Sequence, residues 1–303
     1  MKKLFVTGLS GFVGRSIQKI VSKSDSLELC VPRKRVDILD TKALNDFISS
    51  HKIDYVIHLA GMSHVPTSFR DPKKAYETNF FGTLNLLNAL QQNKFSGRFL
   101  YVSSGDVYGL VKPEQLPLDE SQPLKPRSPY AVSKVAAETM CYQWSQTEAM
   151  DIMVARPFNH IGAGQSEGFA VTDFARQIAE IHLGLREPVI KVGDLTATRD
   201  FTDVDDVAAA YFSLLKSGHT GEIYNVCSSK ELSLDKILKK MLDLAKVDAE
   251  IVVETALLRP SEQKRVMGSR NKITSHTGWM PQVPLDETLM KVLNDWEVRL
   301  THG

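Results

Sequence analysis

The chain has 303 residues, of which 43% are hydrophobic and 24% charged, and its formal net charge is +1. This is the composition of a globular protein with one large domain or two modest ones. The near-zero charge excludes binding to nucleic acid or acidic membranes through bulk charge, so an anionic ligand must be met by local Arg and Lys.

Cysteine content and apolar runs limit the other classes. Cys30, Cys141 and Cys227 lie far apart, and their odd number and spacing exclude a disulfide framework and a zinc site, so we expect no metal. The first apolar run, Leu4 to Val6, is too short for a signal peptide. No stretch approaches the ~20 apolar residues of a membrane span. We expect a soluble cytoplasmic protein.

The first half of the chain alternates strand and helix patterns. Segments that are apolar on both faces predict buried strands over residues 3–8, 27–32, 54–61, 97–104 and 151–159. Helical patterns lie between them, over residues 11–24, 41–52, 71–93 and 129–149. This alternation predicts an α/β fold with a doubly wound parallel sheet.

A glycine-rich loop joins the first predicted strand to the first predicted helix. It carries Gly8, Gly11 and Gly14. Glycine permits positive φ and a close approach of the backbone to a pyrophosphate, and the following helix N-terminus offers free N–H groups to that anion. The loop therefore predicts dinucleotide binding. A tight turn without a ligand is the alternative.

The regular alternation loosens after residue 159. A glycine-rich loop, a helix and a strand–loop–helix unit are expected over residues 160–168, 169–184 and 188–218. A strand over 222–228 returns to the main sheet, and a helix covers 233–246. We predict a nucleotide-binding domain over 1–160, with return segments near 195–228. A smaller substrate-binding region covers 161–194 and 229–303.

Basic residues at the end of the second predicted strand distinguish between cofactors. An acidic residue there would bind the 2′-hydroxyl of NAD, but the segment instead contains Arg33, Lys34 and Arg35, and Arg15 follows the glycine loop. Cations favour the 2′-phosphate of NADP(H), with NAD(H) as the alternative cofactor. A solvated basic turn that binds no phosphate is the alternative to this role. Asp37 accepts from the adenine amino group or caps the next helix.

Tyr130 and Lys134 lie four residues apart in a predicted helix and so share one face. A nearby ammonium is expected to lower the pKa of the tyrosine, which would make it a proton donor or acceptor near neutral pH. Ser104 lies at the tip of the predicted strand 97–104. Because ligands of such sheets bind beyond the strand C-termini, we expect these three side chains to converge with the glycine loop.

These motifs resemble those of the extended short-chain dehydrogenases/reductases that modify sugar nucleotides. The similarity runs nearly end to end and is carried by "TGLSGFVG", "VDILD", "DYVIHLAGMSHV", "NFFGTLNLL", "VSSGDVYG", "SPYAVSK", "RPFNHIGAGQ", "RDFTDVDDV" and "YNVCS". The resemblance implies a Rossmann-type sheet and hydride transfer between a nicotinamide and a sugar carbon. Tyr130 would exchange the proton, Ser104 would polarise the sugar oxygen, and Lys134, supported by Asn79, would hold the nicotinamide ribose.

The resemblance also implies the binding residues. The cofactor site would comprise Gly8, Gly11, Phe12, Val13, Gly14, Arg33, Asp37, Ile38, Leu59, Ala60, Tyr130 and Lys134. The substrate site would comprise His64, Ser104, Asp106, Asn159, Arg199, Arg259 and Glu262, with Ser63 and Ser68 near its mouth. Arginines suit a diphosphate because the guanidinium binds two oxygens at once. For Arg199, Arg259 and Glu262, a surface salt bridge is the alternative. Asp203 and Asp206 are expected to be structural and to cap a helix.

The residues after Ser104 distinguish reduction from dehydration. Dehydratases of this family place an acid and a base there, whereas this chain has Gly105 and Asp106. The missing acid favours reduction of a 4-keto sugar, and the segments are most similar to reductases that convert GDP-4-keto-6-deoxy-D-mannose to GDP-D-rhamnose. The alternatives are a GDP-mannose 4,6-dehydratase, a nucleotide-sugar 4-epimerase and a non-catalytic NADP-sensing regulator.

The family resemblance also implies a homodimer formed through a four-helix bundle. Apolar residues on the helices near 76–92 and 130–148 suggest this surface, namely Leu84, Leu87, Met140 and Trp144. Ordinary core packing of these residues is the alternative.

Overall fold

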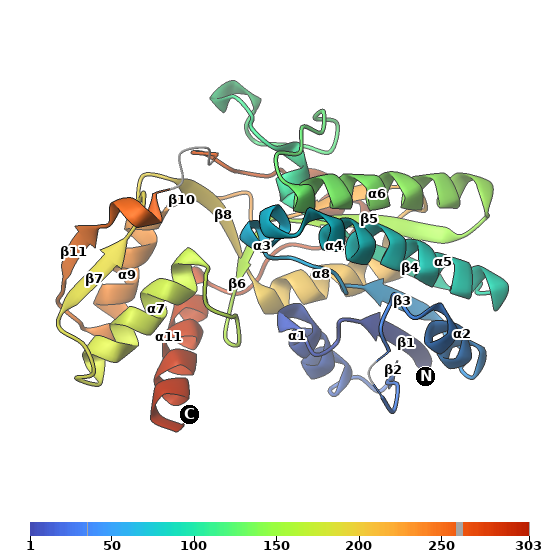
Figure 1. Ribbon diagram of the computed structural model, residues 1–303, viewed down its shortest axis with the longest axis horizontal. Helices are drawn as coiled ribbons and strands as arrows, with labels where there is room; N and C mark the ends of the chain where they lie inside the picture. Colours follow the sequence, from blue (N-terminus) through green and yellow to red (C-terminus); the bar gives the residue numbers. More distant parts are fainter. Residues whose placement is uncertain (35, 259–262, 303) are drawn as a thin grey trace.

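A six-stranded parallel sheet forms the centre of the computed structural model, which describes residues 1–34, 36–258 and 263–302. The strand order is β2–β1–β3–β4–β5–β9 (Figure 1). The strands are β1 (Lys2–Thr7), β2 (Leu27–Cys30), β3 (Tyr55–His58), β4 (Arg98–Val102), β5 (Asp151–Pro157) and β9 (Ile223–Val226). The predicted return strand is confirmed, because β9 pairs with β5. The predicted Rossmann-type fold is also confirmed.

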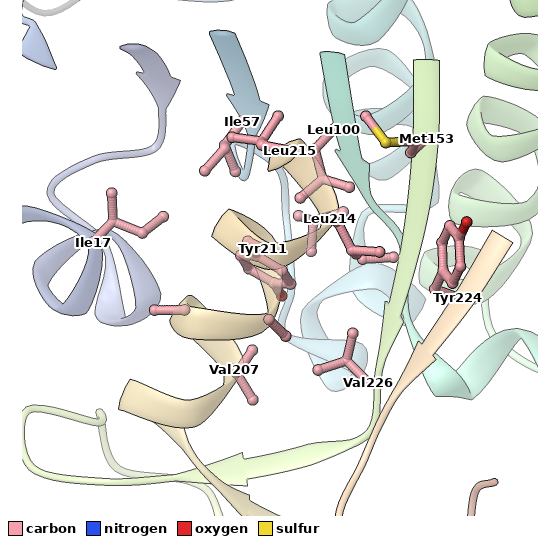
Figure 2. Packing of buried hydrophobic residues seen from close by; sticks show 14 of the residues in the cluster. Ile17, Ile57, Leu100, Met153, Val207, Tyr211, Leu214, Leu215, Tyr224 and Val226 are labelled. Atoms are coloured by element: carbon pink, nitrogen blue, oxygen red, sulfur yellow. The ribbon is translucent and has the colours of Figure 1, made fainter. Parts of the chain in front are cut away.

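Helices cover both faces of this sheet. One face packs against α1 (Phe12–Val21), α8 (Val204–Ser217) and α10 (Asn271–Thr277). The other packs against α2 (Thr41–Ser49), α5 (Gly82–Gln92) and α6 (Pro129–Thr147). Figure 2 shows Val207, Tyr211 and Leu214 of α8 among the side chains of the first face. Because each face is apolar and covered, the polar ends of the strands are left for ligands.

The predicted single helix over residues 71–93 is wrong in detail. The segment forms α4 (Pro72–Tyr76), a π-helical turn η1 (Glu77–Phe81) and α5, and a short helix α3 (Val65–Arg70) precedes it. A π turn adds one residue to the helical repeat, and such turns often occur at functional sites. Here the turn holds Asn79, whose side chain is buried.

The residues expected to form a dimer interface are mostly in the core, so that choice of residues was wrong. Leu87 is 0% exposed and Trp144 is 7% exposed, and Leu84 and Met140 pack against the same cluster. The sequence pattern misled because α6 packs against two apolar clusters, so inward-facing residues occupy more than one stripe of the helix.

The second lobe holds two small sheets. One has the order β10–β8–β6 and the other pairs β7 with β11. The strands are β6 (Asn159–Ile161), β7 (Val189–Val192), β8 (Thr198–Asp203), β10 (Glu231–Ser233) and β11 (Glu250–Val253). The helices are α7 (Ala170–His182), α9 (Leu234–Ala245) and α11 (Leu285–His302), with the 3-10 turn η4 (Thr255–Leu257). Another 3-10 turn, η3 (Pro113–Gln115), lies between β4 and α6 in the chain. Figure 1 shows α7, α9 and α11 on the same side of the molecule as β7 and β11.

Two predicted boundaries fail at this lobe. The strand expected over 151–159 splits at Phe158, because its ring enters a separate apolar cluster while Asn159 begins β6 in another sheet. The loop expected near 198–203 is strand β8. Such short strands are specified by their partners rather than by local sequence. Asp203 accepts from the Asp205 N–H and caps α8, as predicted, whereas Asp206 accepts from the N–H groups of Gln282 and Val283.

In the described part of the chain, no helix combines the length and apolarity that crossing a membrane requires.

Candidate active site

A cavity of about 2020 Å³ lies at the carboxyl ends of the main-sheet strands and continues to the second lobe. Its walls include the glycine loop, the segments that follow β3 and β4, the start of α6, and residues of β6, α7 and β8. Ligands of open α/β sheets bind in this position. The cavity is therefore the candidate active site.

The glycine loop forms one end of the cavity. Gly8 has φ +76°, and a Cβ added there would lie 2.9 Å from the Ala60 nitrogen. A Cβ on Gly14 would lie 2.2 Å from the Leu9 carbonyl oxygen. Gly11 is the N-cap of α1 and brings no side chain to the first helical turn. Glycine is thus required for the turn, and the turn exposes helix N–H groups toward an anion.

Ser104 stands where β4 gives way to the 3-10 turn η2 (Gly105–Tyr108). Its Oγ accepts from the Asp106 N–H at 3.2 Å and so caps this turn. The Ser104 side chain also lies near the Tyr130 side chain and lowers its pKa, and both residues line the cavity. The predicted convergence of Ser104 with the first turn of α6 is therefore present.

The pKa of Tyr130 does not follow the expectation from its spacing to Lys134. Burial raises the pKa of the Tyr130 phenol, the nearby Asp106 carboxylate raises it further, and the neighbouring Ser104 side chain lowers it. Burial lowers the pKa of Lys134 to about 8, and its Nζ donates to the Val102 carbonyl at 2.8 Å. The expected lowering of the Tyr130 pKa was therefore wrong. The tyrosine is a protonated hydroxyl, the form a proton donor needs.

Asn79 connects the π turn to α6 by side-chain hydrogen bonds. Its Nδ2 donates to Ser133 Oγ at 2.8 Å and to the Met62 carbonyl at 3.0 Å, and its Oδ1 accepts from the Met62 N–H at 2.7 Å. Ser133 in turn donates to the Tyr130 carbonyl at 2.6 Å. Asn79 is buried and does not line the cavity, so its contact with α6 is through Ser133 rather than through a ligand.

Most residues predicted for the cofactor line the cavity. They are Gly8, Gly11, Phe12, Val13, Gly14, Asp37, Ile38, Leu59, Ala60, Tyr130 and Lys134. The Phe12 ring stacks on His160 with centroids 5.9 Å apart. Asp37 accepts from the Leu39 N–H at 3.0 Å, and α2 is capped by Asp40, so the capping role considered for Asp37 was wrong.

The three described cations expected at a 2′-phosphate do not line the cavity. Arg33 and Lys34 are exposed. Arg15 donates to the Gly164 carbonyl in the second lobe and, at 3.3 Å, to the Ser10 carbonyl in the glycine loop. Arg35 lies outside the described residues. Among the described residues of the basic turn, those on its flanks line the wall, including Pro32 and Asp37.

The residues predicted for the substrate divide into two groups. His64, Ser104, Asp106, Asn159 and Arg199 line the cavity, as does Ser63, whereas Arg259 and Glu262 lie outside the described residues. Ser68 is fully buried and donates to the Val65 carbonyl, so the expectation that it lies at the mouth was wrong.

Comparison with known proteins is consistent with this geometry. A family model described as GDP-mannose 4,6 dehydratase matches residues 15–292. GDP-6-deoxy-D-mannose reductase of Pseudomonas aeruginosa is 46% identical over 300 residues, which cover 99% of this chain and 98% of that protein.

The chain belongs to the GDP-mannose 4,6 dehydratase family. Within the family's wider fold group, the structure of RMD from P. aeruginosa complexed with NADPH matches with a TM-score of 0.94 at 46% identity, covering 99% of this chain and 100% of that chain. UDP-glucose 4-epimerase of Thermus thermophilus in complex with NAD matches with a TM-score of 0.84 at 28% identity, covering 97% and 98%. The predicted membership in the extended short-chain dehydrogenases/reductases is confirmed.

Several cavity residues of this family member were missed by the sequence. Arg127, Lys191 and Gln165 line the wall, and Phe158 lies beside Gly105. Arg127 directly precedes the Ser128 cap of α6, which was an available signal. Gln165 had no such sequence signal, because its position in the cavity wall depends on the fold of the second lobe. Across the described residues, no three His, Cys, Asp or Glu side chains are grouped so as to hold a metal ion.

His58, at the end of β3, makes the stability of the site sensitive to acid. It is 1% exposed, and its Nδ1 and Nε2 lie 2.6 and 2.9 Å from the hydroxyls of Thr7 and Thr83. Burial lowers the pKa of His58 from its ordinary 6.5 to about 3. Between pH 6.5 and 3, His58 is therefore protonated in the unfolded chain but neutral in the folded one. Its contribution to the free energy of unfolding is present above pH 6.5 and is lost as the pH falls toward 3. We expect this group to remove about 1.4 kcal/mol per pH unit well below pH 6.5.

Urea unfolding between about pH 7.5 and pH 5 measures this slope. His58→Gln is expected to flatten it, whereas His302→Gln, at an exposed position, leaves it unchanged. An unchanged slope in His58→Gln contradicts the prediction.

Proposed function

We propose that the protein reduces the C4 keto group of GDP-4-keto-6-deoxy-D-mannose to give GDP-D-rhamnose, with NADPH as reductant. The observation that carries the proposal is the neighbouring pair of Ser104 and Tyr130 in the cavity, with a glycine at 105. Two hydroxyl donors suit a ketone oxygen, and position 105, directly after Ser104, has no acid for elimination. The relative of 46% identity is named a GDP-6-deoxy-D-mannose reductase, which supports the same reaction.

The residues at the glycine loop fit NADPH. A Cβ on Gly8 would collide with the Ala60 backbone and one on Gly14 with the Leu9 carbonyl, so glycine at both positions permits the tight turn that presents the N-terminus of α1 to a pyrophosphate. The similar structure solved with NADPH supports this choice. When bound, NADPH supplies the hydride that reaches the sugar carbon. Tyr130 and Lys134 line the same cavity and would face its nicotinamide end.

The protein's own groups then act on the sugar oxygen. Ser104 Oγ donates a hydrogen bond to the carbonyl oxygen and so stabilises the charge that develops there. The Tyr130 hydroxyl gives its proton to that oxygen, which leaves a phenolate to be reprotonated from solvent. The Lys134 ammonium holds the cofactor ribose, and the Asn79 bonds keep the first turn of α6 in place.

Diphosphate binding falls to the second lobe. Arg199 lies on β8, where its Nη1 donates to the Thr198 carbonyl at 2.8 Å and the residue lines the cavity. Asn159 and His64 line the same wall and would contact the sugar, and Arg259 and Glu262 complete the proposed set. We propose that residues 1–160, with return segments near 195–228, form the dinucleotide-binding domain and that 161–194 and 229–303 form the nucleotide-sugar region. His64, Asn159 and Arg199 would reach the nucleotide-sugar from the first of these parts.

An assay with separate substrate arms tests the proposal. Purified protein is mixed with GDP-4-keto-6-deoxy-D-mannose and NADPH, and loss of the nicotinamide absorbance is followed with product analysis. We expect oxidation of NADPH and formation of GDP-D-rhamnose, and slower turnover with NADH. Consumption of GDP-D-mannose alone, without net NADPH oxidation, would identify a dehydratase instead.

Position 105 gives a prediction that separates reduction from dehydration. A Cβ at Gly105 would lie 3.3 Å from ring atoms of Phe158, which is 5% exposed, so the ring or the η2 turn must shift. We expect Gly105→Asp to lower reductase kcat by about tenfold through displacement of Ser104 and to gain no dehydratase activity. Gly105→Ala serves as the control for packing alone and is expected to show a similar loss. Turnover of GDP-D-mannose by Gly105→Asp contradicts the prediction.

We further propose that the protein is a cytoplasmic homodimer. The helices α4, η1 and α6 leave apolar side chains uncovered, namely Tyr76, Phe81, Val132 and Tyr142, which are 38%, 51%, 40% and 51% exposed. A second copy of this face would cover them in a four-helix bundle. The described cysteines are free and buried, which suits a reducing compartment. Light scattering tests the mass, and a monomer at micromolar concentration rejects the dimer.

A further inference from the structure

A row of buried polar side chains runs behind the cavity, from α6 to β9. Arg156 on β5 forms a two-point ion pair with Glu138 on α6, through Nη2 to Oε1 and through Nε to Oε2 at 3.1 Å. Its Nη1 donates to the Tyr108 hydroxyl at 2.9 Å. Tyr108 donates to Asn225 Oδ1 at 2.7 Å, and Asn225 Nδ2 donates to the Leu118 carbonyl at 2.9 Å. Each side chain in this row is hydrogen-bonded to the next.

The row joins the two segments that carry the proposed proton donor and the carbonyl-polarising hydroxyl. Glu138 lies one turn after Lys134 and two turns after Tyr130 on α6. Tyr108 is the last residue of η2, the turn whose N-cap is Ser104. A contact at the end of η2 therefore sets where Ser104 stands relative to α6.

The row serves positioning rather than binding. Glu138, Arg156, Tyr108 and Asn225 are 3%, 2%, 1% and 0% exposed, and none of them lines the cavity. A buried ion pair adds little net stability compared with apolar packing, whereas fully bonded polar networks fix a single geometry. The Tyr108 ring also packs in the apolar cluster that contains Phe158 and Cys227. The end of η2 is therefore held by apolar packing of this ring and by the directional hydrogen bonds of its hydroxyl.

We propose that Tyr108 is a positioning residue for the reduction: its hydroxyl, clamped between Arg156 and Asn225, holds η2 so that Ser104 Oγ stays within hydrogen-bond reach of Tyr130. This inference rests on the roles proposed above for Ser104 and Tyr130. Burial raises the pKa of Tyr108 to about 12, so the hydroxyl remains a donor to Asn225 throughout the assay range. Misplacement of a reacting group by about 1 Å is enough to lower a rate by about 10²-fold.

The chain offers a matched control for this hydroxyl. Tyr101, on β4, is 1% exposed, and its hydroxyl is buried with no hydrogen-bond partner. The change Tyr101→Phe removes the same atom from an equally buried ring. It keeps the ring 5.1 Å from Lys134 Nζ. Any loss of rate specific to Tyr108→Phe is then due to the bonds that Tyr108 makes.

The test is a double-mutant cycle on the full-length enzyme, with kcat and the KM for NADPH measured for Tyr108→Phe, Tyr101→Phe, Ser104→Ala and the Tyr108→Phe/Ser104→Ala double variant. We expect Tyr108→Phe to lower kcat about tenfold with KM for NADPH unchanged within about twofold, and Tyr101→Phe to change neither. When Ser104→Ala is already present, Tyr108→Phe should lower kcat by less than about twofold, because its effect acts through Ser104.

Equal losses from Tyr108→Phe with and without the Ser104→Ala change would show a general structural role and overturn the proposal, as would wild-type kcat in Tyr108→Phe. Full activity of Ser104→Ala would instead overturn the role proposed for Ser104, and the inference with it, while leaving the reduction itself observed. If Tyr108→Phe does not fold, Arg156→Lys replaces it in the same cycle, because it keeps the charge beside Glu138 but loses the arm that reaches Tyr108.

Discussion

Tyr130→Phe is expected to lower kcat by about 10²- to 10⁴-fold, the range typical of a lost general acid. The change removes the hydroxyl proposed to deliver a proton to the carbonyl oxygen and keeps the ring that packs at the start of α6. Because burial and Asp106 hold the Tyr130 pKa high, wild-type activity should not require deprotonation of this residue. NADPH affinity, measured by fluorescence titration, should change by no more than about twofold.

Tyr142→Phe is the matched control for this variant. Tyr142 lies on the same helix and is 51% exposed, and it does not line the cavity. It should keep wild-type kcat. Near-full activity of Tyr130→Phe would show that another group is the proton donor.

Asp200→Ala is expected to cause the largest loss of stability, at least about 4 kcal/mol of unfolding free energy. Asp200 is 0% exposed and accepts from the Ser228 N–H at 2.8 Å, the Ser228 hydroxyl at 2.6 Å, the Ser229 N–H at 3.0 Å and the Gly268 N–H at 3.1 Å. These bonds join β8 to the segment after β9 and to residue 268. Alanine would leave all of these donors buried without an acceptor, and each such group costs about 1–3 kcal/mol.

Chemical denaturation measures this loss, with Asp40→Ala as the control. Asp40 caps α2 through one bond to the Ala43 N–H at an exposed position, so its loss should be about 1 kcal/mol. If Asp200→Ala lowers the free energy of unfolding no more than Asp40→Ala does, the proposed importance of the Asp200 hydrogen bonds is wrong.

The parts of the site that depend on local sequence were predictable. Gly8, Gly11 and Gly14 follow a buried strand and precede a helix, and the absence of a Cβ is a property of the residue itself. The alternation of strands and helices predicted the main sheet because its strands are apolar on both faces. Asp203 was placed as a cap for the same local reason.

The parts that depend on distant contacts were not predictable. Spacing placed Tyr130 and Lys134 on one helix face, but it did not show that the Lys134 amine points at the Val102 carbonyl or that Asp106 raises the Tyr130 pKa. Arg15 has a long flexible side chain, and its partner, Gly164, lies in the loop that precedes α7. Residues near Phe158 change sheet because of tertiary packing, which periodicity does not record.

The proposed reduction is tested by transfer of deuterium from NADPH labelled at its transferable position. We predict GDP-D-rhamnose that carries the deuterium on C4 of the sugar, with one NADPH oxidised for each sugar reduced, as measured by NMR and nicotinamide absorbance. A product without deuterium at C4, or turnover of GDP-D-mannose by loss of water without net oxidation of NADPH, would contradict it.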